Sequence, residues 1–155
     1  MTHEELMRRA VALATENVRH GGGPFGAVIA RDGEIIAEGV NRVTAAHDPT
    51  AHAEVQAIRA AAERLGTHAL TGCDIYASCE PCPMCLGAIY WARLDRLFYA
   101  ATKADAAAAG FDDAFIYREL ALDHAARRLP CRSLLSEEGG APFEAWAGNG
   151  DRIEY

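Results

Sequence analysis

Residues 73–91 read CDIYASCEPCPMCLGAIYW, an apolar strand-like run that leads through two prolines into an apolar helix-like run. CDIYAS (73–78) has the β-branched and aromatic content of a strand, and PMCLGAIYWARL (83–94) has the length of a helix. Because the helical run is apolar on all sides, we expect this helix to be buried centrally. The stretch predicts one strand–helix unit of an α/β fold.

Similar elements extend from this unit in both directions. Asp32-Gly33 between FGAVIA and EIIAEGV predicts a β-hairpin, and a capping box at Thr2 and Glu5 predicts an N-terminal helix. The spacing of apolar residues predicts further helices at 51–65, 111–120 and 142–146. It also predicts strands at 96–100 and 131–135. This order predicts a three-layer α/β/α sandwich, with helices on both faces of a five-stranded mixed sheet.

Length and composition favour one ordinary domain. The chain has 155 residues, is 50% hydrophobic and 24% charged, and carries a net charge of −7. A negative surface repels phosphate backbones, so we expect no nucleic-acid partner. No apolar run approaches the ~20 residues of a membrane span, and the polar start MTHEELMRRA does not predict a signal peptide. Five cysteines, three of them within seven residues, favour reduced thiols in a cytoplasm over a disulfide framework.

The prolines distinguish the clustered cysteines from one another. A residue before proline is disfavoured in helical conformation, so Cys82 precedes the helix that Pro83 begins. Cys82 is then the N-cap and Cys85 the third helical residue, so that both sulfurs lie at a helix N-terminus that favours thiolate. Cys79 lies behind Pro81 at the end of the strand, outside this arrangement.

HAE (52–54) begins the helix at 51–65 and supplies a further ligand. His52 and Glu54 lie on opposite sides of the apolar stripe and can reach one point only because they are near the helix end. His52, Cys82 and Cys85 would leave the fourth position of a tetrahedral Zn²⁺ open to water, which is the pattern of a catalytic site. If Cys79 were a fourth ligand, the zinc would have no position left for water, which is the pattern of a structural site. Glu54 favours catalysis, because a bound water needs a group that accepts its proton.

The pattern H-x-E followed by P-C-x-x-C is the signature of zinc nucleobase deaminases, and this chain resembles that family. Within it, the chain is most similar to the bacterial guanine deaminases, over essentially its whole length. The matching pieces are GGPFGAVI (22–29), HDPTAHAEV (47–55), SCEPCPMCLGAIYWAR (78–93), AGFDDAFIY (109–117) and the terminal EY.

The resemblance implies roles for individual residues. His52, Cys82 and Cys85 would bind zinc and Glu54 would transfer protons. Phe25, Asn41 and Trp91 would contact or line the purine site, and Asp113 would read the purine and assist proton transfer. The resemblance also implies a homodimer that exchanges residues 142–155, so that Tyr155 would close the partner's pocket.

Without the resemblance, these residues have simpler interpretations. Phe25 and Trp91 are typical of core aromatic residues, and Asn41 is typical of a turn. Asp113 is typical of a carboxylate at a helix N-terminus, and Asp112 competes with it for the same role. Cys73 and Cys131 are expected to be buried thiols in strands.

The expected activity is hydrolytic deamination of guanine, a small purine base, to xanthine and ammonia. Cytosine, an aminotriazine or tRNA adenosine are alternative substrates, although the tail AWAGNGDRIEY lacks the basic character of a tRNA-binding helix. A zinc-stabilised module without catalysis is a further alternative, against which Glu54 is the discriminating residue.

Overall fold

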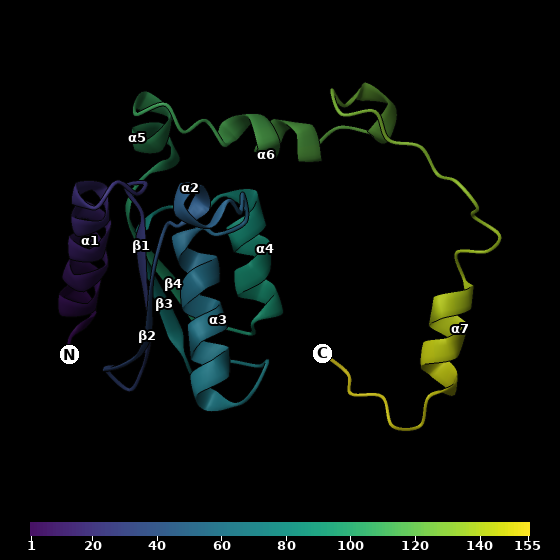
Figure 1. Ribbon diagram of the computed structural model, residues 1–155, viewed down its shortest axis with the longest axis horizontal. Helices are drawn as coiled ribbons and strands as arrows, with labels where there is room; N and C mark the ends of the chain where they lie inside the picture. The colour runs from purple at the N-terminus through teal and green to yellow at the C-terminus, as the bar shows by residue number, and fades with distance from the viewer. The chain divides into compact units, whose positions relative to one another are not determined.

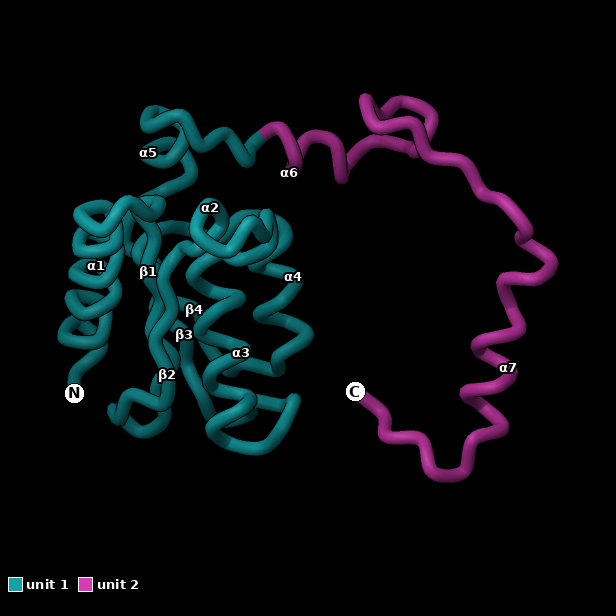
Figure 2. The backbone as a smooth tube through the Cα atoms, in the orientation of Figure 1, with its two compact units in different colours: residues 1–114 teal, residues 115–155 magenta.

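The strand–helix unit predicted from residues 73–91 is present in the computed structural model, which describes residues 1–155. It consists of β3 (Asp74–Cys79) and α4 (Pro83–Trp91). The chain divides into two compact units, residues 1–114 and residues 115–155, drawn in different colours in Figure 2. The predicted sheet and all candidate residues except Tyr155 belong to the first unit.

The first unit contains a mixed sheet of four strands in the order β2-β1-β3-β4. Its other strands are β1 (Gly26–Arg31), β2 (Glu34–Val40) and β4 (Arg96–Ala101). β1 pairs antiparallel with β2 and β3, whereas β3 and β4 are parallel. The hairpin turn has positive φ at Asp32 (52°) and Gly33 (80°), which is the conformation that an Asp-Gly pair favours.

The prediction of a fifth strand at residues 131–135 was wrong. These residues form no strand and are exposed, as is Cys131, which we had expected to be buried. A strand needs a neighbour that completes its backbone hydrogen bonds, and the second unit contains no strand at all.

Helices cover both faces of the sheet, as predicted (Figure 1). α1 (His3–Arg19) covers one face, where Leu6 and Ala10 pack with Val28 and Tyr76. α3 (Ala53–Leu65) covers the other face through a row of buried alanines, which are Ala53, Ala57 and Ala61. The first unit is therefore a three-layer α/β/α arrangement.

Close packing of α3 on the sheet depends on glycine. A Cβ atom at Gly39 of β2 would overlap the backbone of α3 at Ala53 and Ala57. Small residues on both surfaces thus bring α3 near the sheet, and this contact places the N-terminal end of α3 beside that of α4.

The prediction that α4 is centrally buried was only half right. Cys85 and Ile89 are buried, but Tyr90 and Trp91 are 72% and 64% exposed. Apolar composition on every side cannot distinguish a helix that is covered all round from one that leaves a side open.

Short helices make up the rest of the chain. α2 (Val43–Ala46) follows β2, and α5 (Lys103–Ala108) follows β4. α6 (Ala114–Leu120), η1 (His124–Ala126) and α7 (Ala141–Gly148) follow in that order. No helix combines the length and apolar character needed to cross a membrane.

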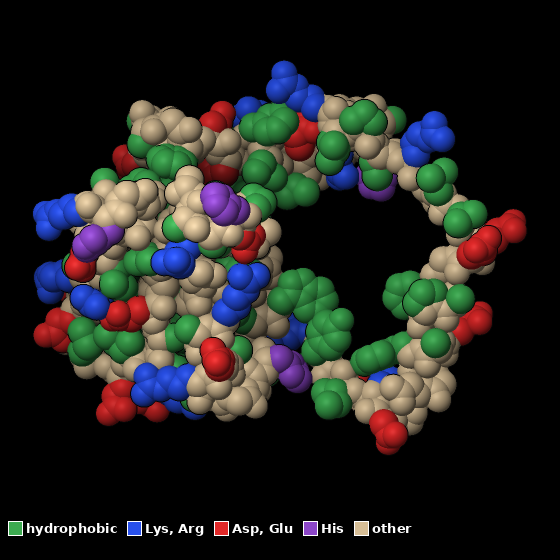
Figure 3. All heavy atoms as spheres, in the orientation of Figure 1, with side chains coloured by type: hydrophobic (Ala, Val, Ile, Leu, Met, Phe, Trp, Pro, Cys, Tyr) green, Lys and Arg blue, Asp and Glu red, His purple; other side chains and the backbone are tan.

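The second unit buries none of its own residues. Figure 3 shows hydrophobic side chains exposed along it. Those that are at least 70% exposed are Leu129, Leu134, Leu135, Phe143, Ile153 and Tyr155.

Candidate metal centre and catalytic site

The candidate metal ligands lie at the N-terminal ends of two neighbouring helices. Cys82 is the N-cap of α4, Pro83 is its first residue, and the Cys85 N–H donates to the Cys82 sulfur at 3.5 Å. His52 is the N-cap of α3. The proline rule therefore predicted the local geometry of α4 correctly.

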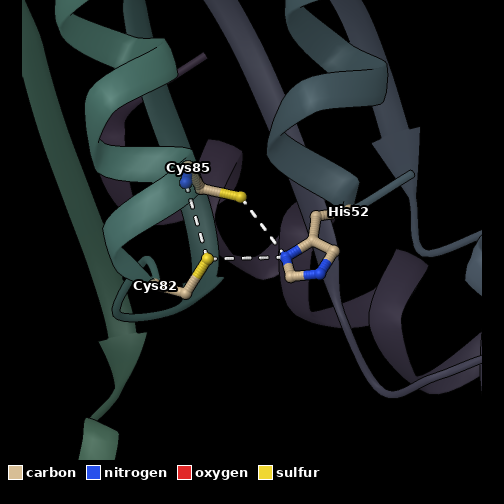
Figure 4. Close-up of side chains that lie close together, drawn as sticks. All are labelled: His52, Cys82 and Cys85. Atoms are coloured by element: carbon tan, nitrogen blue, oxygen red, sulfur yellow. Dashed lines mark hydrogen bonds between the residues drawn. The ribbon is translucent and has the colours of Figure 1, made fainter. Parts of the chain in front are cut away.

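The three side chains converge on one point, as Figure 4 shows. His52 Nδ1 lies 3.6 Å from Cys82 Sγ and 3.4 Å from Cys85 Sγ. The three candidate ligand atoms all lie within 4.8 Å of one another. One imidazole nitrogen and two sulfurs are a donor set that suits Zn²⁺, with a fourth tetrahedral position available.

The two sulfurs differ in acidity. The pKa of Cys82 is held far below its usual value, first by a hydrogen bond with the Cys85 side chain and also by a hydrogen bond with His52. The pKa of Cys85 is raised by its neighbour Cys82 and by burial. Cys82 therefore loses its proton first, and thiolate is the form that binds a metal.

The loop before α3 holds His52 in position. The Asp48 carboxylate accepts hydrogen bonds from the Thr50 N–H and hydroxyl at 2.8 and 2.7 Å. The Arg42 N–H donates to the Ala51 carbonyl at 2.9 Å, which ties the end of β2 to the residue before His52. These contacts explain why a histidine outside the helix proper has a defined place.

Glu54 lies in the first turn of α3 and is only 7% exposed. Burial raises the pKa of its carboxyl group, against the opposing effect of hydrogen bonds with its own backbone and the Cys85 side chain. The end of α3 thus lets both His52 and Glu54 lie beside the Cys85 side chain.

Cys79 is separate from the cluster. Its thiol donates to the Thr102 carbonyl at 3.6 Å, and burial raises its pKa to about 11. Its sulfur is not one of the three ligand atoms that lie within 4.8 Å of one another, so we do not assign Cys79 as a metal ligand.

Phe25 and Asn41 are held by the loops at one end of β1 and β2. The Phe25 ring meets the Phe111 ring edge-on, with centroids 5.0 Å apart. The Asn41 N–H donates to the Phe25 carbonyl at 3.2 Å, and its Oδ1 accepts from the Val43 N–H at 3.1 Å. Asn41 thus forms the turn expected of it, while its Nδ2 group bonds to nothing else in the protein.

An apolar cavity of about 590 Å³ lies beside Phe25, between α1 and α5. Phe25, Cys79 and Phe111 are among its lining residues, but the metal cluster and Glu54 are not. Because neither the three candidate metal ligands nor Glu54 lines this cavity, we do not assign it as the catalytic pocket.

Asp113 is distinguished from Asp112 by burial. The Asp113 Oδ1 atom is buried without a hydrogen-bond partner, whereas Asp112 is exposed. Burial raises the pKa of Asp113, and the nearby charge of Cys82 raises it further. A buried, unpartnered carboxylate oxygen is a suitable group for binding a ligand.

Trp91 is not one of the residues that form the cluster. Trp91 lies on α4 six residues after Cys85, about 9 Å along the helix, with the Arg93 guanidinium 5.9 Å from its ring centroid. Tyr155 belongs to the second unit, where its ring meets Trp146 edge-on at 6.5 Å.

One ion pair near Asp113 was missed by the sequence analysis. Lys103 pairs with Glu80 at 3.3 Å, and the two charges act on the pKa of Asp113 in opposite directions, with Lys103 lowering it and Glu80 raising it. These residues are 23 positions apart and meet because β3 and β4 are parallel neighbours. No local motif signals such a pair.

Comparison with known proteins agrees with this geometry. Residues 1–101 match the family described as the cytidine and deoxycytidylate deaminase zinc-binding region. The chain belongs to this family of zinc-dependent deaminases, so Zn²⁺ is the metal that the cluster fits.

Among its relatives, the chain is 56% identical to the guanine deaminase of Bacillus subtilis, with all of both chains covered. Its structure matches the X-ray structure of that enzyme with a TM-score of 0.97, covering 100% of this chain and 99% of that one. A solved guanine deaminase from Nitrosomonas europaea matches with a TM-score of 0.69 and 35% identity, over 72% of this chain and 65% of that one. A tRNA-specific adenosine deaminase from Agrobacterium fabrum is 50% identical over only 50% of this chain and 51% of its own length.

Proposed function

We propose that this protein is a zinc-dependent guanine deaminase that hydrolyses guanine to xanthine and ammonia. The observation that carries the proposal is the similarity to a guanine deaminase over the entire chain, including the second unit, which lies outside the matched family region. Loss of the amino group is a degradative step, so we assign the reaction to purine catabolism.

His52, Cys82 and Cys85 are the proposed zinc ligands. Their convergence within 4.8 Å and the low pKa of Cys82 support this assignment. Zinc bound there supplies a Lewis acid that activates water for attack on C2 of guanine.

Glu54 is the proposed proton carrier, because it is the buried carboxylate next to the cluster. It accepts a proton from the attacking water and delivers it to the ring nitrogen beside C2, while the new C2–oxygen bond forms. It then transfers the second proton of that water to the 2-amino group. The C2–nitrogen bond breaks, ammonia leaves, and the carbonyl of xanthine remains.

Phe25, Asn41, Trp91 and Asp113 are the proposed purine-binding residues. The unpartnered Nδ2 group of Asn41 can donate to an acceptor of the base, and the buried Oδ1 of Asp113 can accept from a ring N–H. The Phe25 ring offers a flat apolar surface, and Asp113 also assists proton transfer at the base.

We also propose that the 155 residues form one deaminase domain in a homodimer, in which residues from about 142 to 155 cross to the partner. Two observations support this. The second unit exposes large hydrophobic side chains that it cannot bury itself, and β4 is paired on only one side. Tyr155 then covers the base bound by the other subunit and excludes water.

A small purine is a better substrate for this chain than nucleic acid. Its net charge of −7 disfavours phosphate backbones, and tRNA-specific adenosine deaminases match 50% to 71% of the chain, whereas a guanine deaminase matches all of it. Five free cysteines are consistent with a cytoplasmic location.

An ammonia-release assay tests the proposal. The zinc-loaded protein is incubated separately with guanine, adenine, cytosine and an aminotriazine. We expect release from guanine with the highest kcat/KM. A preference for another base contradicts the substrate assignment, and no release from any base contradicts catalysis.

A further inference from the structure

Asn17 joins the end of α1 to both loops that carry the proposed base-binding residues. Its Nδ2 group donates one hydrogen bond to the Gly23 carbonyl at 2.8 Å and another to the Asn41 carbonyl at 2.9 Å. The side chain is half-buried. Both N–H bonds of the Asn17 side-chain amide are therefore donated to backbone carbonyl groups and not to solvent.

The glycine loop is packed directly on Asn17. The Gly22 N–H donates to the Asn17 carbonyl at 2.8 Å, and a Cβ atom at Gly22 would overlap the Asn17 amide. Asn17 thus holds the loop through its backbone and its side chain together. This loop leads into Phe25 two residues after Gly23, so its position determines where the Phe25 ring lies.

Asn41 is held from the same point. Its carbonyl accepts from Asn17, its N–H donates to Phe25, and its Oδ1 accepts from the Val43 N–H. The next residue, Arg42, bonds to Ala51, the residue before His52. A continuous series of hydrogen bonds therefore runs from Asn17 through both proposed base-binding residues to the edge of the metal cluster.

We propose that Asn17 is a positioning residue for the deamination, which sets the relative placement of Phe25 and Asn41 without touching the base. This inference rests on the proposed function. Its chemistry is specific, because the two carbonyl oxygens require two N–H donors from one planar group. Aspartate has the same shape but would place carboxylate oxygens against those carbonyls.

The test compares Asn17→Asp and Asn17→Ala with Ala12→Asp. Ala12 is exposed on the same helix and does not line the cavity beside Phe25, so Ala12→Asp makes the same change in net charge as Asn17→Asp away from that cavity. For both Asn17 variants we expect KM for guanine to rise about 10- to 100-fold, because misplaced binding groups weaken substrate positioning. We expect kcat to stay within about threefold and zinc content to be unchanged, since the ligands and Glu54 are not altered. Ala12→Asp should retain wild-type KM.

Binding of the product xanthine, measured by calorimetry, gives a second readout that does not depend on turnover. Weaker binding to both Asn17 variants supports positioning. Wild-type KM and wild-type xanthine affinity in Asn17→Ala contradict it, as does an equal rise in KM for Ala12→Asp. If Asn17→Asp does not fold, Asn17→Ala alone decides. If the wild-type protein itself releases no ammonia from guanine, the proposed function fails instead.

Discussion

Glu54 combines burial with proximity to the Cys85 side chain. Glu54→Gln keeps the size of the side chain and removes its capacity to carry a proton. We expect kcat to fall by about 10²–10⁴-fold or more, since Glu54 handles every proton of the proposed cycle. Steady-state kinetics and zinc analysis check this.

Glu63→Gln is the matched control, because Glu63 is exposed on the same helix. We expect it to behave as wild type. Near-normal turnover of a zinc-replete Glu54→Gln protein would show that another group carries the protons.

The individual cysteines have separable roles. Cys82→Ser and Cys85→Ser each remove one proposed ligand, and we expect both proteins to lose zinc, because a serine hydroxyl is a much weaker ligand than a thiolate. Cys79→Ser should retain one zinc per chain, since Cys79 bonds to Thr102 outside the cluster. Metal analysis after dialysis measures the difference. Zinc loss in Cys79→Ser with retention in either other variant would reverse the assignment.

Between elements, α1 is tied to β2 by an ion pair that titrates. The Arg9 guanidinium donates two hydrogen bonds to the Glu38 carboxylate, at 2.6 and 2.8 Å. The hydrogen bonds from Arg9 lower the pKa of Glu38 below its ordinary value of 4.5. Because the pKa is lower in the folded state, the pair stabilises the fold above pH 4.5, and this contribution is lost as the pH falls through the folded-state value.

Arg9→Met should therefore lower the free energy of unfolding at pH 7 by about 0.5–1 kcal/mol, a modest amount because water screens a half-exposed pair. At about pH 3, below the unfolded-state pKa of Glu38, the difference from wild type should be smaller than at pH 7. Urea unfolding at both pH values checks this, with Arg8→Met as the control. Arg8 pairs only with exposed Glu4, so its replacement should have little effect at either pH. An Arg9→Met deficit that is independent of pH would mean that lost packing, not charge, is responsible.

Across the whole molecule, the second unit buries none of its own apolar side chains, and this is the reason for proposing a partner subunit. Deleting residues 153–155 removes the proposed Tyr155 cover but leaves α7 in place. We expect zinc content and dimerisation to be retained, because the exposed Phe143 and Trp146 side chains of α7 remain available for the proposed contact with the partner. Guanine kcat/KM should fall by about tenfold or more, because water enters the pocket.

Kinetics and light scattering on the truncated and full-length proteins measure both effects. If deletion of residues 153–155 leaves kcat and KM unchanged, Tyr155 does not cover the bound base. If light scattering shows that the full-length protein is a monomer, the proposed exchange of C-terminal segments between subunits is wrong.

The sequence by itself determined the local features of this protein, because these depend on neighbouring residues. Pro83 excluded Cys82 from the helix and so brought both sulfurs to one helix end. Asp32-Gly33 specified the hairpin through its positive φ angles, and Gly66 ended α3 in the same way. The zinc deaminase motif then connected His52 and Glu54 with the cysteines.

Only the tertiary structure decided which residues are buried and which residues far apart in the sequence contact one another. Burial singled out Asp113 from Asp112, and pairing of β3 with β4 brought Lys103 to Glu80. Residues 131–135 have the composition of a strand but no neighbouring strand within their unit, and Trp91 is apolar but exposed. The role of Asn17 likewise depends on two loops that meet it in space. Burial and hydrogen bonding between remote segments depend on which surfaces come together, and a one-dimensional pattern does not contain that information.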